Sequence, residues 1–327
     1  MEKISAYVTE KAKSELKPYT YDGKVGDNDV LIKVSHCGVC QSDIHLVDGD
    51  WGDVYPCIAG HEIIGTVDRT GEKVKTVKIG DKVGVGWQCN SCNNCEYCEN
   101  EEETFCKENQ PTCVEHFGGF AQKVISNERF VIPIPETMDS AKTAPLLCAG
   151  ITVYTPLKRY VKKGDKVAII GIGGLGHLAI QFAKKMGCSV TAISRSKDKE
   201  LESKEFGADN FITSEPKPDS FDLIINTTHI SPDMNMYMAS IKPKGTFVQV
   251  GISETSLDVD PGLLIGGNKS VAGSGIGSPK MIKEMIKFAQ KNNVYAKVEV
   301  LPMSNINEAL NKTRMNEARY RIVLENK

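Results

Sequence analysis

KVAIIGIGGLG, residues 166–176, decides the fold of this chain. Its apolar first half predicts a buried strand, and its glycines form a G-x-G-x-x-G pattern that opens an amphipathic helix closing at Gly187. Glycine permits a tight turn and a close approach of the backbone to a pyrophosphate, which the N-terminus of the following helix attracts. The stretch therefore predicts a dinucleotide site at Gly171, Gly173, Gly174, Leu175 and Gly176. The alternative is a tight strand-to-helix turn without a ligand.

Apolar strands alternate with helical patterns on both sides of this loop, from Pro145 onward. The predicted strands are 166–170, 189–193, 221–226 and 245–250, with a helix after each of the first two. Such alternation is typical of βαβ units, in which helices cover both faces of a parallel sheet. We therefore expect an α/β domain built on a doubly wound parallel sheet of the Rossmann type.

The residues before Pro145 have a different texture. Glycine, proline and cysteine separate short β-branched runs at 29–34, 63–68, 81–85 and 119–125, which predicts an irregular β domain with functional loops. After the parallel sheet, the apolar pattern predicts a helix at 281–290. The segments 294–301 and 320–324 return to strand-like patterns, so we expect the tail to rejoin the first domain.

Length, charge and cysteine content limit the classes of function. The 327 residues exceed what one hydrophobic core organises, so two domains are expected. The net charge of -2 gives no reason to expect nucleic acid as a partner, and no apolar segment reaches the length of about 20 residues that spans a membrane. The N-terminus lacks the apolar core of a signal peptide, so we expect a cytoplasmic protein. Eleven cysteines, an odd number, favour metal ligation over disulfides in such a compartment.

Cysteines are densest in WQCNSCNNCEYCENEEETFC, residues 87–106. Cys92, Cys95, Cys98 and Cys106 have the spacing C-x2-C-x2-C-x7-C, which fits one tetrahedral zinc ion held by four thiolates. Four thiolates leave no open position for a substrate, so this zinc would be structural. Spacing alone also allows a set that begins at Cys89 and ends at Cys98. The remaining alternative is a metal-free loop, which would expose clustered thiols to oxidation.

A second, sparser group of candidate ligands consists of Cys37 and Cys40 in a C-x-x-C pattern, His61 and Cys148. Two thiolates and one imidazole leave a fourth zinc position free, as a Lewis-acid catalytic site requires. The alternative is that each of these cysteines, and Cys57, is a small buried apolar residue. Spacing does not decide between the two interpretations.

The end of the predicted second strand bears on the choice of dinucleotide. An enzyme that uses NAD usually carries an acidic residue there for the adenosine ribose, whereas this chain has Ser194, Arg195 and Ser196, followed by Lys199. Hydroxyls and a guanidinium would bind a 2′-phosphate, so the sequence predicts NADP(H). The alternative is that Arg195 and Lys199 are solvated loop charges.

Five motifs together resemble the zinc-dependent medium-chain alcohol dehydrogenases: CGVCQSDIH, AGHEIIG, the cysteine cluster, LLCAGIT and GIGGLGHLAIQFAK. PLLCAGITVY and VTAISRS further resemble the cinnamyl alcohol dehydrogenase subgroup. The resemblance covers nearly the whole chain and implies an irregular GroES-like β-barrel at 1–148 and 285–327, with a Rossmann domain at 149–284.

The resemblance also assigns roles to individual residues. It implies that Cys40, His61 and Cys148 bind a catalytic zinc, with Glu62 beside the metal as a possible alternate ligand and Asp43 orienting the ligand histidine. It implies that the structural zinc is bound by Cys92, Cys95, Cys98 and Cys106. Cys37 and Cys89 are then not ligands.

A proton path is implied as well. Ser42 and His45, three residues apart on an expected helical turn, resemble the hydroxyl-to-histidine relay of the family. Gln41 replaces a basic residue that touches the pyrophosphate in many relatives. Trp51 either borders the substrate or only packs, and the sequence assigns no role to Cys37, Cys57, Cys89, Cys113 or His116.

The function implied by the resemblance is a zinc-dependent oxidoreductase that interconverts primary alcohols and aldehydes with NADP(H). We expect aromatic or broad-range substrates, a preference for aldehyde reduction, two zinc ions per chain, small-molecule partners only and a homodimer. One alternative is an NAD-dependent polyol dehydrogenase. Another is a dinucleotide-binding protein without catalysis, which would hold one zinc ion per chain.

Overall fold

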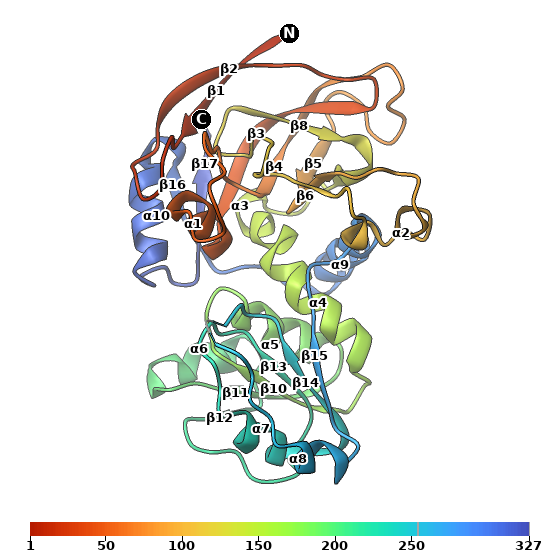
Figure 1. The fold of residues 1–327 in the computed structure, drawn as a ribbon, viewed down its shortest axis with the longest axis vertical. Helices are drawn as coiled ribbons and strands as arrows, with labels where there is room; N and C mark the ends of the chain where they lie inside the picture. Colours follow the sequence, from red (N-terminus) through yellow and green to blue (C-terminus); the bar gives the residue numbers. More distant parts are fainter. Residues whose placement is uncertain (254, 327) are drawn as a thin grey trace. The chain divides into compact units, whose positions relative to one another are not determined.

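The computed structural model describes residues 1–253 and 255–326 and divides the chain into two compact units (Figure 1). Unit 1 consists of Met1–Ile151 and Ile276–Lys327, and unit 2 is Thr152–Gly275. The sequence predicted boundaries at 148/149 and 284/285. The second boundary lies earlier in the structure because helix α9 (Pro279–Asn292) belongs to unit 1, where Gln290 donates to the Thr137 hydroxyl.

Unit 1 is built on a mixed, mostly antiparallel seven-stranded sheet in the order β16-β17-β3-β4-β5-β9, with β8 also paired to β3. The strands are β3 (Asp29–Val39), β4 (Glu62–Thr70), β5 (Lys82–Val85), β8 (Lys123–Asn127), β9 (Ile132–Pro133), β16 (Val298–Pro302) and β17 (Arg321–Glu325). Two small two-stranded antiparallel sheets accompany this sheet, made by β1 (Glu2–Val8) with β2 (Lys17–Gly23) and by β6 (Gln88–Asn90) with β7 (Gln110–Pro111). Because β17 pairs antiparallel with β3, the tail does rejoin the first domain.

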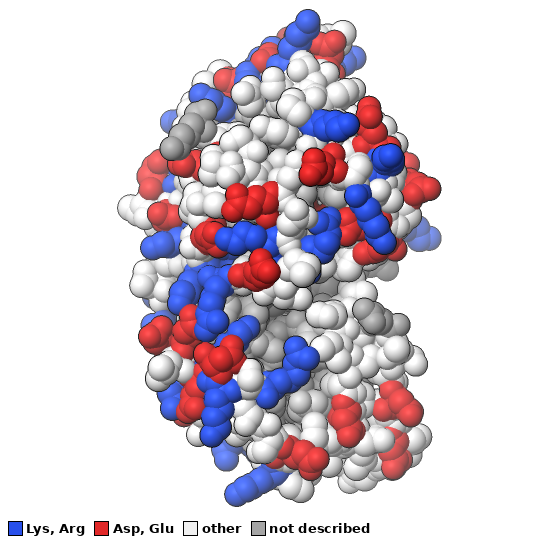
Figure 2. All heavy atoms as spheres, turned by 90° about the vertical axis from the view of Figure 1, so that its left-hand side faces the viewer, with Lys and Arg blue, Asp and Glu red and all other residues white. Residues whose placement is uncertain are grey.

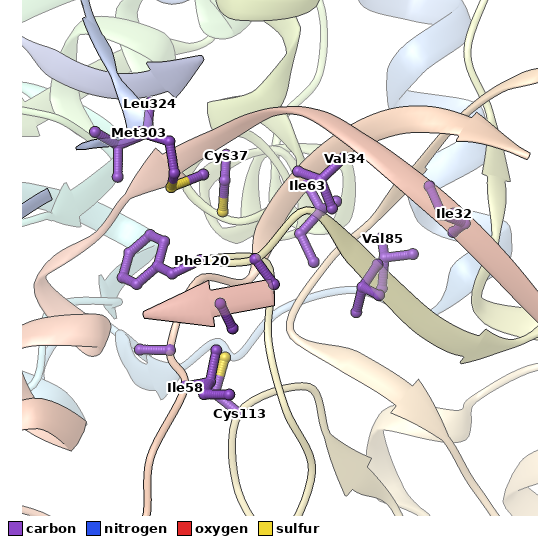
Figure 3. Packing of buried hydrophobic residues seen from close by; sticks show 14 of the residues in the cluster. Ile32, Val34, Cys37, Ile58, Ile63, Val85, Cys113, Phe120, Met303 and Leu324 are labelled. Carbon is purple, nitrogen blue, oxygen red and sulfur yellow. The ribbon is translucent and has the colours of Figure 1, made fainter. Parts of the chain in front are cut away.

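Apolar side chains from several segments fill one core in unit 1. Figure 3 shows part of it, where Cys37, Ile63 and Val85 from the sheet meet Ile58, Cys113 and Phe120 from the connecting segments. The helices of this unit are α1 (Gln41–Asp48), α2 (Glu96–Glu99), α3 (Ser140–Thr143), α9 and α10 (Ile306–Arg314), and α4 (Ala149–Tyr160) leads into unit 2.

Several predicted strands differ at their ends from the observed ones, and backbone hydrogen bonds explain the two largest losses. Residues 119–122 precede β8 because Gly119 and Phe120 donate instead to the carbonyls of Gly60 and Ala59. Residues 294–297 are not part of β16, since helix α9 ends at a left-handed Asn293 and Val294 donates back to Ala289.

Unit 2 is a six-stranded parallel sheet in the order β12-β11-β10-β13-β14-β15. The strands are β10 (Lys166–Ile170), β11 (Ser189–Ile193), β12 (Asn210–Ile212), β13 (Phe221–Asn226), β14 (Ile241–Gln249) and β15 (Ser270–Gly273). The helices are α5 (Gly176–Lys185), α6 (Glu200–Glu205), α7 (Met234–Ser240) and α8 (Pro261–Ile265). The strand order reverses next to β10, which is the doubly wound arrangement that the sequence predicted.

Charged side chains of both signs are interspersed on the face shown in Figure 2, in keeping with the net charge of -2. Among the described residues, no helix is both long and apolar enough to span a membrane.

Candidate functional site

Four buried side chains of unit 1 converge although they come from distant parts of the sequence. Potential ligand atoms of Cys40, His61, Glu62 and Cys148 all lie within 4.8 Å of one another. The Cys40 and Cys148 sulfurs are 3.9 Å apart, and Nε2 of His61 is 3.2 Å from the sulfur of Cys148. The contact between the thiols lowers the pKa of Cys40 and raises that of Cys148, which favours one thiolate in this cluster. Cys37 lies outside the cluster, with its thiol directed at the Gly38 carbonyl.

Asp43, on helix α1, orients two members of this cluster. One of its carboxylate oxygens accepts from Nδ1 of His61 and from the Gly60 amide, both at 2.8 Å, and the other accepts from the Cys40 amide at 2.9 Å. A carboxylate that fixes Nδ1 leaves Nε2 as the free donor of a lone pair toward the cysteines. One buried anion therefore positions both Cys40 and His61.

Glu62 has a partner that the sequence did not reveal. One of its oxygens forms an ion pair with Arg321 on β17, while its other oxygen and Nε of Arg321 are buried without a hydrogen-bond partner among the described residues. Burial raises the pKa of the Glu62 carboxyl, and the Arg321 guanidinium opposes this shift. A buried carboxylate needs a compensating positive charge, so a basic partner for Glu62 could have been expected from its burial.

Helix α1 carries Ser42 and His45 as the sequence predicted, in one short helix. The Ser42 hydroxyl is 3.8 Å from the Cys40 sulfur. Nδ1 of His45 lies 2.8 Å from a carboxylate oxygen of Asp50, and the imidazole stacks on Trp51 with ring centroids 4.9 Å apart. His45 thus has a carboxylate on one nitrogen and an aromatic ring on one face.

Trp87 is a site residue that sequence reasoning missed. Its ring meets His61 edge to face at 4.9 Å and meets Trp51 at 6.0 Å, so a line of aromatic rings connects His45 with His61. The only sequence signal was its position just before the cysteine cluster, at the start of the segment that follows β5.

The second cysteine cluster forms a compact lobe around helix α2. Potential ligand atoms of Cys92, Cys95, Cys98 and Cys106 lie within 4.8 Å of one another, with sulfur separations of 3.5 to 3.9 Å. Backbone hydrogen bonding from Asn94 lowers the pKa of Cys92 to about 7, whereas burial raises the pKa of Cys106 to about 12. Cys89 lies apart, with its thiol directed at the carbonyls of Gln110 and Pro111.

The glycine-rich loop connects β10 with α5 in unit 2. Gly171 has a φ of +84°, and a side chain on Gly176 would collide with the Gly171 carbonyl, so both positions require glycine. A side chain on Gly173 would meet nothing within 4 Å, which leaves open space beside the loop. Helix α5 begins here without a side-chain cap, and its His177 and Leu178 amides donate to the carbonyls of Gly173 and Leu175. The N-terminus of the helix still directs the positive end of its dipole toward the loop, which favours an anion there.

The segment after β11 lies next to this loop. Lys199 donates to the carbonyl of Ile172 at 2.8 Å, which ties it to the glycine-rich turn. Arg195 and Ser196 are exposed, Ser194 is half-buried, and the Ser196 hydroxyl bonds to Asp198. No acidic residue stands directly after β11, where Ser194 and Arg195 follow Ile193.

Comparison with known proteins identifies the family. An alcohol dehydrogenase GroES-like domain matches residues 26–136, and a zinc-binding dehydrogenase domain matches residues 174–291. An aldehyde reductase of Synechocystis sp. is 39% identical over 98% of this chain and 98% of its own length. The chain belongs to the zinc-dependent medium-chain alcohol dehydrogenases.

Two solved structures extend this result to the fold of the dehydrogenase. A cinnamyl alcohol dehydrogenase of Sorghum bicolor has a TM-score of 0.94 at 35% identity, covering 99% of this chain and 98% of that one. The cinnamyl alcohol dehydrogenase of Helicobacter pylori, solved with NADP(H), has a TM-score of 0.92 at 33% identity with the same coverage. The expected combination of a GroES-like domain with a Rossmann-type sheet is confirmed.

Both cysteine clusters of this dehydrogenase fit zinc by their donor sets. Two thiols and an imidazole nitrogen fixed by a carboxylate are the donors of a catalytic site with an open position. Four thiols of the lobe are the donors of a closed structural site.

Proposed function

We propose that this dehydrogenase interconverts primary alcohols and aldehydes with NADP(H), in the direction of aldehyde reduction, on aromatic or broad-range substrates. The observation that carries the proposal is the buried convergence of Cys40, His61 and Cys148 around an Asp43 carboxylate that orients two of them. Packing alone does not require two thiols and an imidazole so close together in a buried site, whereas shared ligation of one metal ion accounts for all three groups.

In this proposal Cys40, His61 and Cys148 hold the catalytic zinc, and Cys92, Cys95, Cys98 and Cys106 hold the structural one. A zinc ion with three protein ligands supplies Lewis-acid chemistry that polarises a substrate carbonyl. Glu62 is placed to exchange as a ligand because one of its buried oxygens has no hydrogen-bond partner among the described residues. Arg321 holds the other oxygen and so limits how far the carboxylate moves.

The proposed proton path uses Ser42 and His45. Asp50 accepts from Nδ1 of His45, which leaves Nε2 to take up or release a proton, and the stacked Trp51 ring restricts the tilt of the imidazole. The Ser42 hydroxyl lies beside the Cys40 sulfur, at the metal end of the same helix. Helix α1 itself is fixed by a bidentate pair between Asp48 and Arg314 at 2.7 and 2.9 Å.

The dinucleotide is assigned to the glycine-rich loop of unit 2. NADP(H) supplies the hydride, and its pyrophosphate would lie against Gly171, Gly173, Gly174, Leu175 and Gly176 at the start of helix α5. Ser194, Arg195, Ser196 and Lys199 would bind the 2′-phosphate. The same residues argue against the NAD-dependent polyol dehydrogenase, which would need an acid at position 194 or 195.

A screen of aldehydes tests the proposal. Purified protein is expected to contain two zinc ions per chain and to oxidise NADPH in the presence of aromatic and aliphatic aldehydes, with at least about tenfold lower kcat/KM for NADH, since one charge-assisted hydrogen bond contributes that much. The Cys40→Ser variant should contain one zinc ion and be inactive. Protein with two zinc ions that reduces none of these aldehydes contradicts the proposed function, and unchanged zinc content in Cys40→Ser contradicts the ligand assignment.

The proposal includes a homodimer and a cytoplasmic location. All eleven cysteines are free thiols, which persist in a reducing compartment. Strand β15 is an edge strand with an exposed Val271, and Ile265 on the preceding helix α8 is 78% exposed. An exposed strand edge flanked by apolar side chains is suited to pairing with a second copy of the chain.

A further inference from the structure

Cys113 is a buried thiol beside the proposed zinc site, and neither the sequence nor the proposed mechanism gives it a role. It is 2% exposed, and its sulfur lies within 4.8 Å of ligand atoms of both Asp43 and His61, which are fully buried. The Asp43 oxygens already accept three hydrogen bonds. A carboxylate so fully occupied is not free to bind a second metal, so this group of three is better explained as support for the histidine.

The backbone on either side of Cys113 is held firmly. The amide of Thr112 donates to the Trp87 carbonyl at 2.8 Å, and its hydroxyl donates to the Gly86 carbonyl at 2.7 Å. Nδ1 of His116 donates to the Thr112 carbonyl at 3.0 Å, and the Gly118 amide donates to the Ile58 carbonyl at 2.7 Å. The segment that carries Cys113 therefore has little freedom to move relative to the segment before His61.

The thiol also fills its space closely. A side-chain carbon on Gly118 would lie 2.6 Å from the Cys113 sulfur, and Figure 3 shows Cys113 among the buried side chains of the core with Ile58 and Phe120. A larger residue at position 113 would collide, and a smaller one would leave a gap beside the pair of Asp43 and His61.

Trp87 and Cys113 thus reach the same imidazole from one connected piece of backbone. The Trp87 ring meets His61 edge to face at 4.9 Å, and Thr112 links the Trp87 backbone to that of Cys113. We propose that Cys113 is a positioning residue for His61: its thiol packs against the hydrogen bond between Asp43 and His61 and keeps Nε2 directed at the metal. This inference rests on the proposed ligation of zinc by His61.

The consequence is slower loss of the catalytic zinc. Residues that support a metal ligand contribute about 10- to 100-fold to metal affinity, and a weakly polar thiol belongs at the low end of that range. We expect Cys113→Ala to accelerate release of the catalytic zinc about tenfold, and Cys113→Ser, which keeps size and hydrogen-bonding ability, to stay within about threefold of the parent. The structural zinc should be released at the parental rate in both variants.

These rates are measured by following the release of zinc from the holoenzyme to the chelator 4-(2-pyridylazo)resorcinol. The phase that is missing in Cys40→Ser identifies the catalytic zinc. Cys89→Ala is the matched control, because Cys89 is a buried thiol of the same core that contacts the same loop but lies outside the group around His61. The Cys89→Ala variant should release its catalytic zinc at the parental rate. The d–d spectrum of the cobalt-substituted catalytic site should change in Cys113→Ala and not in Cys89→Ala.

Unchanged zinc release in Cys113→Ala overturns the proposal, and so does equal acceleration in Cys89→Ala, which would indicate a general loss of packing. Aldehyde reduction is measured separately. A parent that retains two zinc ions but reduces no aldehyde contradicts the proposed function, while the comparison of zinc release still decides the role of Cys113.

Discussion

Gly60 illustrates how a single residue shapes the proposed catalytic site. It has a φ of +95°, and a side-chain carbon there would lie 2.7 Å from a Phe120 ring carbon and 2.9 Å from the Cys37 sulfur. Its amide donates to Asp43, and the next residue is His61. Close contact between the segments 57–61 and 118–120 therefore depends on glycine at this position.

Gly60→Ala should destabilise unit 1 by about 2–4 kcal/mol, because backbone strain adds to overpacking. Gly80→Ala separates the two effects, since Gly80 has a φ of +91° but a side chain there meets nothing within 4 Å. Strain alone should cost about 1 kcal/mol. Urea denaturation followed by tryptophan fluorescence reports on unit 1, which contains both tryptophans, Trp51 and Trp87. Equal losses in the two variants would contradict the packing argument.

Ser194 offers a test of cofactor choice at a single position. Ser194→Asp places a carboxylate after β11, where it should repel a 2′-phosphate and accept from ribose hydroxyls. We expect the ratio of kcat/KM for NADPH to that for NADH to fall about 10- to 100-fold, the range of one or two charge-assisted hydrogen bonds. Ser256→Asp adds the same charge at an exposed serine of the same unit and should leave the ratio unchanged. A constant ratio in Ser194→Asp would argue against 2′-phosphate binding at this segment.

How far the sequence predicts a site depends on how local the signal is. The glycine loop and the cysteine lobe lie within short stretches, so their spacing carries the information. Cys40, His61 and Cys148 span more than a hundred residues, and only the resemblance to a family identified them as one set of ligands. Trp87 and Arg321 were missed because their roles arise from tertiary contacts, as with Arg321 and Glu62, 259 residues apart. Asp50 was missed although it lies close to His45 in the sequence, because no motif marks it as a partner of the imidazole.

At the scale of elements, the apolar period predicted β10, β11 and β13 at their observed bounds. The observed ends of helices and strands differ from the predicted ends where capping or loop hydrogen bonds determine them. Helix α9 begins at Pro279 because the Ser278 hydroxyl caps it, two residues before the predicted start. Strand β15 was not predicted, since a four-residue edge strand of largely exposed residues has no alternating pattern.

The cysteine lobe shows how an element with little apolar sequence is held. Helix α2 has four residues, and the lobe is attached to the rest of unit 1 by Arg129, which bonds to Glu103 and to the Cys98 carbonyl. Tyr97 and Phe105 meet edge to face but remain 42% and 63% exposed. With so little burial, the lobe should depend on its metal for order.

Removal of the structural zinc by Cys106→Ser should therefore open the lobe to a glutamate-specific protease, which has sites at Glu96, Glu99 and 101–103. We expect cleavage there to be about tenfold faster or more, since the metal supplies most of the folding energy of such sites. Cys89→Ser should keep both zinc and protection. Loss of the structural zinc in Cys89→Ser with retention in Cys106→Ser would instead favour the ligand set that begins at Cys89.

At the scale of the whole molecule, each unit has its own sheet, and each sheet has a short edge strand that contains an exposed valine. Strand β15 in unit 2 exposes 37% of Val271, and strand β16 in unit 1 exposes 44% of Val300. The proposed homodimer uses β15, because Ile265 on α8 adds exposed apolar surface close to it in sequence. The exposed fractions of Val271 and Val300 are similar, so the same substitution at these two positions provides a controlled comparison of the two edge strands.

Val271→Lys should convert the dimer to a monomer, because a charge on the pairing edge opposes strand addition. Sedimentation velocity at micromolar concentration measures the change, and NADPH binding should persist because β15 is three strands from β10 in the sheet. Val300→Lys, the matched substitution on the edge strand of the other sheet, should remain dimeric. A monomeric parent, or dissociation by Val300→Lys with a dimeric Val271→Lys, would exclude β15 as the pairing edge and direct the search for an interface to unit 1.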